Sequence, residues 1–306
     1  MKKIQAVPTI KKGVSCVVRT PLVLVPYLVY FVIAVLFMVY GISKIEALLP
    51  AFAGPEESPF NIMGIFFSLL AFAFLAILVI GLLSPFIEGW TFAALASAHK
   101  NEPVSLKEAA RKAGSKYLGM LALAILIVII SSVVGSIVST PLTIMRYMRM
   151  FEVASTSVPP STMFISQIRW SVVTYGVVTM VTALVMVLFV YMKPAYIIGD
   201  IDLSKSLNDG LDTARNNYLA SLVIFLVFTV IEAGVFLAPF AVMLSKGVSF
   251  LDMETLMNIQ DITEVYPYIQ ILVILGAVLI LMTLLVRVIL SAAISYAYMD
   301  SHEMLS

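Results

Sequence analysis

The sequence predicts an all-α protein that six helices embed in a membrane, built as three repeated units. Three observations lead to this class. Of the 306 residues, 61% are hydrophobic and only 12% are charged, whereas soluble domains carry about 25% charged residues. The mean hydropathy is +1.04, and apolar runs long enough to span a bilayer recur along the whole chain. Two segments about 100 residues apart also align with each other. We therefore expect a single membrane domain over residues 1–306.

Six apolar runs approach or exceed the roughly 20 residues that a helix needs to cross the hydrocarbon core. The second, fourth and sixth runs are followed by further helix-compatible sequence, so we expect those helices to continue to about 98, 199 and 299. The predicted spans are 22–42, 62–84, 117–139, 170–192, 219–244 and 268–290.

The basic residues predict the orientation of the chain. Thirteen of the 19 lysines and arginines fall before the first span or in the loops after the second and fourth spans, and five fall in the other loops. Loops rich in lysine and arginine stay on the cytoplasmic side of a cell membrane. The sequence therefore predicts that both termini are cytoplasmic.

The internal repeat places residues 105–125 on residues 206–226 without gaps, and a fainter copy begins at Thr9. We expect three units, at about 9–98, 105–200 and 206–300, each with a short amphipathic helix and a helical hairpin. The clearest matches between the two stronger copies are Ser105 with Ser206, Leu106 with Leu207, Glu108 with Asp209, Ala113 with Ala214, and Tyr117 with Tyr218.

Each short amphipathic helix should lie in the membrane interface on the cytoplasmic side. Ser105 and Ser206 have acidic residues three positions later, which predicts that they cap the second and third of these helices. Aromatic and basic side chains anchor such helices at the headgroup level. The predicted anchors are Tyr117, Tyr218, Lys112, Lys116 and Arg215.

The third unit carries a family resemblance. Residues 194–202 (PAYIIGDID) followed by 206–219 (SLNDGLDTARNNYL) resemble prokaryotic multi-pass proteins that are similar to the membrane domain of glycerophosphoryl diester phosphodiesterases. The resemblance implies an accessory membrane role. It assigns no catalytic residue, because the phosphodiesterase chemistry of that family belongs to a soluble domain that this sequence does not contain.

Three ionisable residues fall within the predicted spans: Glu88, Glu232 and Arg287. Their offsets from the cytoplasmic helix ends correspond to about 16–21 Å of helix, so we expect similar depths. A charge at the centre of a span costs roughly 2.5–3.5 kcal/mol, so it should be paired, neutralised or functional. One hypothesis pairs Arg287 with Glu232, Glu88 or both. The alternatives are that Glu88 and Arg287 extend to the interface, or that the three form a proton or ion pathway.

Other polar residues support less specific predictions. Ser131 and Ser132 occupy the position in the third span that corresponds to Glu232, and they could line a polar core or hydrogen-bond between helices. We expect His99 and His302 to be solvated at helix ends. The only cysteine, Cys16, excludes an intrachain disulfide, and no spacing of histidine, cysteine or carboxylate residues matches a metal site or a catalytic motif.

The sequence therefore favours a non-enzymatic accessory or scaffold protein of the cell membrane, which acts through protein partners or lipids. The alternative is a small-solute transporter that uses Glu232, Glu88 and Arg287. An intramembrane enzyme ranks behind both, because no nucleophile, metal site or acid–base pair is visible. We expect membrane lipids as partners, with a membrane protein or a second copy of the chain as further possibilities, and no nucleic acid, metal or cofactor.

Overall fold

The computed structural model describes residues 1–52, 59–154, 160–245 and 266–305, and every regular element in these ranges is a helix. Six of the helices contain segments long and apolar enough to cross a membrane, which confirms the six predicted spans. The main helices of the spans are α2 (Val25–Phe52), α3 (Pro59–His99), α5 (Tyr117–Ala154), α6 (Pro160–Met186), α9 (Tyr218–Ser245) and α11 (Tyr266–Ser301). The first span begins before α2, at Pro21, and the fourth runs beyond α6 to Ile197.

Long helices form here because leucine, isoleucine, valine and phenylalanine fill whole turns, and a helix satisfies its own backbone hydrogen bonds in lipid. Many of these side chains are exposed on the protein, such as Leu118 at 78% and Ile77 at 71%. Exposure of this kind is expected where the surrounding solvent is hydrocarbon. The composition of the spans therefore fits a multi-pass membrane protein.

The fourth span departs from the continuous helix predicted to about residue 199. Helix α6 ends at Met186, a short 3₁₀ helix, η2 (Val187–Phe189), follows, and α7 (Met192–Ile197) continues the chain. The break lies directly before Pro194, which cannot donate a backbone hydrogen bond to the carbonyl of Val190 and whose ring clashes with that carbonyl in a regular helix. The apolar pattern alone does not reveal this break, because it continues through the proline.

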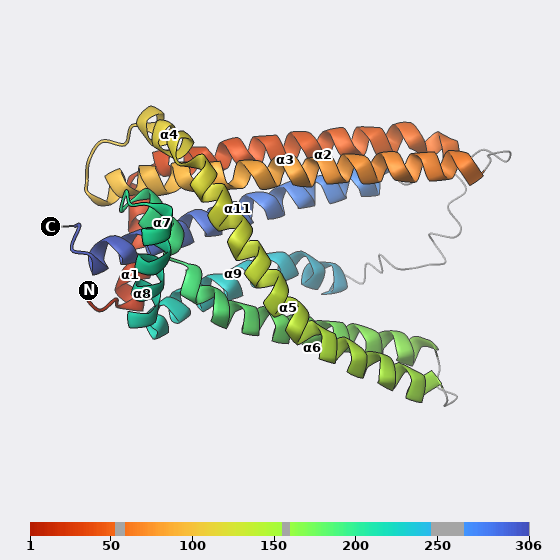
Figure 1. The fold of residues 1–306 in the computed structure, drawn as a ribbon. Coiled ribbons are helices and arrows are strands. Elements are labelled where there is room, and N and C mark those ends of the chain that lie inside the picture. Colours follow the sequence, from red (N-terminus) through yellow and green to blue (C-terminus); the bar gives the residue numbers. More distant parts are fainter. Residues whose placement is uncertain (53–58, 155–159, 246–265, 306) are drawn as a thin grey trace.

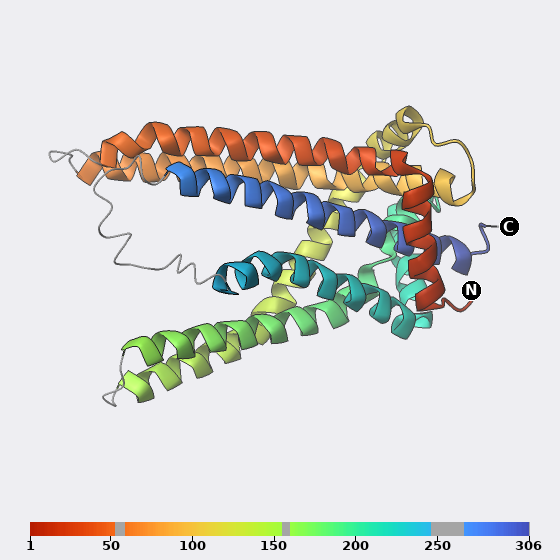
Figure 2. The same cartoon turned by 180° about the vertical axis from the view of Figure 1, so that it is seen from behind.

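Three shorter amphipathic helices accompany the spans: α1 (Ala6–Arg19), α4 (Leu106–Ser115) and α8 (Leu203–Asn216). A second 3₁₀ helix, η1 (Pro21–Leu24), joins α1 to α2. Each short helix packs against a helix of another part of the bundle: α1 packs on α11, α4 on α3, and α8 on α7. Figures 1 and 2 show these helices at the end of the molecule where both termini lie.

Glycines allow two of these helices to approach closely. A Cβ atom on Gly13 would lie 2.7 Å from the backbone nitrogen of Ala293 in α11, and one on Gly210 would lie 2.7 Å from the backbone of Met192 in α7. Alanines Ala113 in α4 and Ala214 in α8 are fully buried. The apolar faces of the amphipathic helices thus pack tightly onto the bundle.

Of the two predicted N-terminal helix caps, the one at Ser105 is confirmed and the one at Ser206 is wrong. The Oγ atom of Ser105 accepts a hydrogen bond from the backbone nitrogen of Glu108, at 3.4 Å, as the capping motif predicts. Ser206 does not cap, because α8 already begins at Leu203 with Asp202 at its N-cap. The buried Ser206 hydroxyl donates instead to the carbonyl of Leu203, at 2.7 Å.

The bundle is packed at one end and divided at the other. The core side chains near the termini come from several helices and include fully buried Val23, Leu95, Met120, Tyr191 and Tyr298. Away from the termini, the pair α5 and α6 diverges from the group of α2, α3 and α11 in both views (Figures 1 and 2). Polar side chains from several of these helices line a cavity.

The expectation that His99 and His302 are solvated is wrong. A ring nitrogen of His99 lies 3.0 Å from the carbonyl oxygen of Ala292, which links α3 to α11. His302 lies 3.1 Å from a carboxylate oxygen of Asp209, and the Tyr298 hydroxyl donates to the other oxygen at 2.8 Å. Both histidines therefore help to hold together the tightly packed end of the bundle near the termini, which we call the closed end.

Candidate functional site

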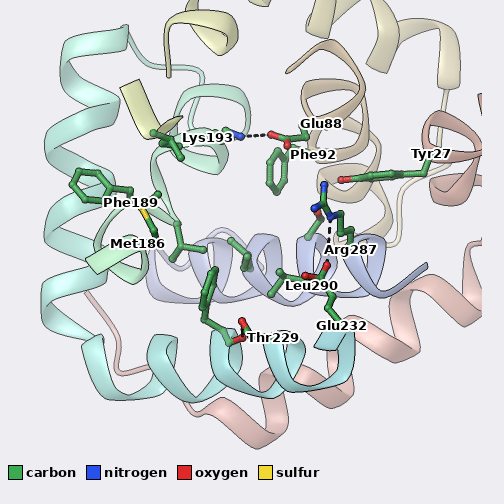
Figure 3. Close-up of a pocket in the computed structure, with 15 residues that line it drawn as sticks. Tyr27, Glu88, Phe92, Met186, Phe189, Lys193, Thr229, Glu232, Arg287 and Leu290 are labelled. Carbon is green, nitrogen blue, oxygen red and sulfur yellow. Dashed lines mark hydrogen bonds and ion pairs between the residues drawn. The ribbon is translucent and has the colours of Figure 1, made fainter. Parts of the chain in front are cut away.

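A cavity of about 370 Å³ lies among α2, α3, α9, α11 and the chain around η2 and α7. Figure 3 shows the side chains that line it. Aromatic and aliphatic groups make up most of the wall, as in many ligand sites. Its four charged residues are Glu88, Lys193, Glu232 and Arg287.

Glu88 on α3 and Lys193 on α7 form the first ion pair, in which the lysine Nζ donates to the carboxylate. Both side chains are well enclosed, with 23% of Glu88 and 17% of Lys193 exposed. Lys193 is brought to this position by the helical break before Pro194, since α7 starts at Met192. The pair thus ties α7 to α3 across the cavity wall.

Glu232 on α9 and Arg287 on α11 form the second pair, with 3.4 Å between the arginine Nε and the carboxylate Oε1. This pair is more open, because 53% of the Arg287 side chain and 31% of the Glu232 side chain are exposed. Figure 3 shows the Tyr27 hydroxyl pointing toward the same guanidinium. A single, long contact leaves most of the hydrogen-bonding capacity of Arg287 available.

The depth of the site follows from positions along the helices. Glu232 comes 14 residues after Tyr218, where α9 begins, and Arg287 comes 14 residues before Ser301, where α11 ends. At 1.5 Å per residue, each lies about 21 Å along its helix. Both residues also lie inside the candidate membrane spans. The second ion pair therefore lies at the depth of the candidate membrane spans.

A second cavity of about 370 Å³ adjoins the first on the side of α5 and α6. The two cavities share lining residues, including Glu232, Thr229 and Phe225. Ser131 lines the second cavity, as the polar-core hypothesis allows, whereas Ser132 is exposed and lines neither cavity among those described. Glu232 thus stands between a charged space and a more apolar one.

The two predicted tyrosine anchors make the same kind of contact. The Tyr117 hydroxyl donates to the carbonyl of Leu82 in α3, at 2.9 Å, and the Tyr218 hydroxyl donates to the carbonyl of Leu184 in α6, also at 2.9 Å. Each tyrosine begins a span and holds it to the span 34 or 35 residues earlier. The anchors therefore connect helices, beyond the interfacial role that the sequence predicts.

The predicted basic anchors differ from one another. Lys116 forms an ion pair with Asp200 at 2.5 Å and donates to the carbonyl of Tyr196 at 2.8 Å. The hydrogen bond from Lys116 lowers the pKa of the Asp200 carboxyl. Lys112 is half-buried, and burial lowers the pKa of its ammonium group. Arg215 is exposed.

The sequence identifies three of the four charges and leaves the partner of Arg287 open between two carboxylates. Arg287 does contact Glu232, as one form of the hypothesis states, while Glu88 is paired with Lys193. The sequence prediction ends the fourth span at 192, so it places Lys193 outside the membrane, in the continuation of that helix to about 199. A lysine within the apolar sequence FVYMKPAYII is the signal that could have found it. Tyr27 and Thr229 carry no sequence signal of their own.

The described residues offer no group of three or more histidine, cysteine, aspartate or glutamate side chains that could hold a metal ion. The thiol of Cys16 in α1 is buried, and burial raises its pKa to about 11. A buried thiol of this kind is a weak nucleophile, since the thiolate is the reactive form.

Fold and cavity together define a multi-pass α-helical membrane protein with paired charges at membrane depth. Comparison with known protein families, known proteins and solved structures finds no match to this chain. The resemblance to the membrane domain of glycerophosphoryl diester phosphodiesterases therefore stays a prediction.

Proposed function

We propose that this chain is a non-enzymatic protein of the cell membrane that acts through lipids, and that its cavity holds the polar part of a lipid molecule. The observation that carries the proposal is the exposure of Arg287, whose side chain is 53% exposed although it lies within a candidate span. Exposure of an arginine to hydrocarbon costs at least about 2.5–3.5 kcal/mol. Water or a polar ligand must therefore fill the space that Arg287 faces.

The second cavity favours a lipid over water alone. Val178, Ala183 and Met186 contribute apolar surface to it, on the side of α6. Because it shares lining residues with the charged cavity, one amphiphilic molecule can place its headgroup beside Arg287 and a chain along α6. Ligand sites commonly combine a mostly apolar wall with a few polar groups that fix orientation.

The experiment is purification in a mild detergent followed by native mass spectrometry of the lipids that stay bound. We expect the unmodified protein to retain phospholipid and the double variant Glu232→Gln/Arg287→Gln to lose most of it. Arg111→Gln is the matched control, since it removes an exposed arginine that lines neither cavity. Equal retention by all three proteins would refute a lipid site in the cavity.

We propose the threefold repeat and the cytoplasmic termini as part of the same description. The parallel hydrogen bonds of Tyr117 and Tyr218 support the repeat, as does the packing of the three amphipathic helices. The basic residues near the termini support the orientation.

The cytoplasmic position of the N-terminus can be tested at Val18, which is 75% exposed on α1. A cysteine there should react with a membrane-impermeant maleimide only after the cells are opened.

A small-solute transporter is the second candidate function. It is favoured by the hydroxyl groups of Ser131, Thr179 and Thr182, which line the second cavity beyond Glu232. Transporters commonly place their substrate sites near the bilayer midplane. This function predicts that Glu232→Gln abolishes a solute flux into proteoliposomes while thermal stability is nearly unchanged. Equal loss of both would indicate a structural role.

A protein partner or a second copy of the chain remains part of the proposed accessory role. Affinity purification of the tagged protein from its native membrane, with mass spectrometry of co-purifying proteins, tests this. A stoichiometric protein that stays bound would make the chain a subunit of a larger assembly, whereas a lone particle with bound lipid would support action through lipid alone.

A further inference from the structure

We infer that the cavity selects a zwitterionic phospholipid with a primary ammonium group, as in phosphatidylethanolamine, whose phosphate binds Arg287 and whose ammonium binds Glu232 and Thr229. This inference rests on the proposed function and adds the chemical class of the headgroup. It depends on three features of the site: its charge balance, the difference between its two ion pairs, and the acceptors on α9.

The charges of the cavity balance, with two carboxylates and two cationic groups. A purely anionic ligand would take Arg287 away from Glu232 and leave that carboxylate unpaired at membrane depth. A charge at membrane depth needs a partner or water, because it is costly in hydrocarbon. A ligand that carries both charges supplies a new partner to each residue, so the cavity stays neutral.

The two pairs differ in how readily they can exchange partners. Lys193 donates a hydrogen bond to Glu88, and less than a quarter of each side chain is exposed. Arg287 reaches Glu232 only through Nε, at 3.4 Å. Its two terminal nitrogens donate no hydrogen bond within the part of the chain that the structure describes. The Arg287–Glu232 pair is therefore the one that a ligand opens.

Arginine suits the phosphate half of such a ligand. Its guanidinium group is a planar fork that binds two phosphate oxygens at once, and such bidentate bonds are among the stronger ones in proteins. The terminal nitrogens of Arg287 that lack a protein acceptor among the described residues are the ones that this geometry requires. Lys193 remains with Glu88 and keeps the opposite wall of the cavity in place.

The ammonium half is matched by two neighbouring residues of α9. Glu232 and Thr229 are three residues apart on that helix, so they share a face, and both line the two cavities. The Thr229 hydroxyl donates its proton to the carbonyl of Phe225, at 2.9 Å. Its oxygen can therefore accept a hydrogen bond from the ligand. A primary ammonium has three N–H donors for these acceptors, whereas the trimethylated ammonium of phosphatidylcholine has none.

The residues of α6 that line the second cavity indicate where the acyl chains of the ligand lie. Thr182 and Met186 lie one turn apart there and line the second cavity. Val178 and Ala183 add apolar surface to the same wall, so an acyl chain can lie along α6.

The experiment measures binding to the full-length protein in detergent by native mass spectrometry, with phosphatidylethanolamine, phosphatidylcholine and phosphatidylglycerol of identical acyl chains. We expect phosphatidylethanolamine to bind about tenfold more tightly than either of the others. Thr229→Val, a nearly isosteric change outside both ion pairs, should reduce that preference at least threefold, and Glu232→Gln should abolish it. Arg111→Gln should leave both the binding and the preference unchanged, because Arg111 is exposed and lines neither cavity.

The outcomes separate the two levels of the proposal. Equal binding of all three lipids, or a preference for phosphatidylglycerol, overturns the headgroup inference while the lipid-binding function stands. Retention of none of them overturns the function itself. Free glycerophosphoethanolamine, which carries the same charges without acyl chains, is the last probe. Binding as tight as that of the lipid would assign the site to a soluble zwitterion and overturn the lipid source.

Discussion

The strength of coupling within the two ion pairs is the quantity that tests the site most directly. We expect Glu88 and Lys193 to be more strongly coupled than Glu232 and Arg287, although all four residues line one cavity. The perturbations are two double-mutant cycles. One uses Glu88→Gln, Lys193→Met and both changes together, and the other uses Glu232→Gln, Arg287→Met and both together.

The magnitudes follow from the enclosure of each pair. Removal of one partner from a buried pair costs about 3–5 kcal/mol, whereas exposed pairs contribute about 0–1 kcal/mol. Exposures of 17% and 23% place Lys193 and Glu88 toward the buried limit, so we expect a coupling energy of about 2 kcal/mol. Exposures of 53% and 31% and a distance of 3.4 Å place Arg287 and Glu232 near the other limit, at about 0.5 kcal/mol.

The assay is reversible unfolding of the purified protein in mixed detergent micelles, followed by circular dichroism. A third cycle on Lys205 and Asp202 supplies the baseline, because these side chains are 74% and 84% exposed and 3.8 Å apart. Their coupling should be indistinguishable from zero. A coupling at Arg287–Glu232 equal to or larger than that at Glu88–Lys193 would refute the assignment of the former as the exchangeable pair.

Three further predictions concern the closed end of the bundle. Gly13→Ala should destabilise the protein by about 1–3 kcal/mol in the same unfolding assay, because its Cβ would lie 2.7 Å from the backbone of α11. Gly81→Ala, which meets no atom within 4 Å, should be neutral or stabilising by up to about 1 kcal/mol; equal losses would contradict the close packing. Cys16, with its pKa raised to about 11, should react with maleimide at pH 8 about 100-fold more slowly than a cysteine at Val18 in a cysteine-free chain, and similar rates would show that the thiol is accessible. Asp200→Asn should lower the melting temperature at neutral pH. The lysine that pairs with Asp200 lowers the pKa of its carboxyl, so the stabilisation is present above the ordinary value of 3.8 and is lost as the pH falls through the lowered value. The difference in melting temperature between the two proteins should therefore shrink below about pH 4, and a constant difference would exclude the ion pair as its source.

The six spans could be predicted from the sequence because their signal is strong and local. A run of about 20 consecutive apolar residues is rare outside membrane-spanning helices, and each predicted run overlaps one of the long helices of the structure. The helix boundaries that failed depend on single residues. The fourth span breaks before Pro194, and α8 begins at Leu203, upstream of the serine expected to cap it.

The candidate site could be predicted only in part, because its geometry depends on how the helices are rotated against one another. Depth along a helix can be counted in residues, which is why Glu232 and Arg287 could be placed at one level. Which carboxylate faces the arginine depends on rotation, and one residue changes it by about 100°. Lys193 reaches Glu88 only because the chain leaves the regular helix between Met186 and Met192. No local pattern in the sequence encodes that rotation.

The two ion pairs give the cavity two different properties that a ligand site needs. The pair of Lys193 and Glu88 joins α7 to α3, so it fixes a segment that the proline has released from α6. The pair of Arg287 and Glu232 joins α11 to α9 through one long contact, so its charges are balanced when the cavity holds only water and available when a ligand enters. Variants of the first pair should therefore lose folded protein, and variants of the second should lose ligand while the fold persists. If Glu88→Gln and Glu232→Gln reduced the yield of folded protein equally, this division between a structural pair and a binding pair would be wrong.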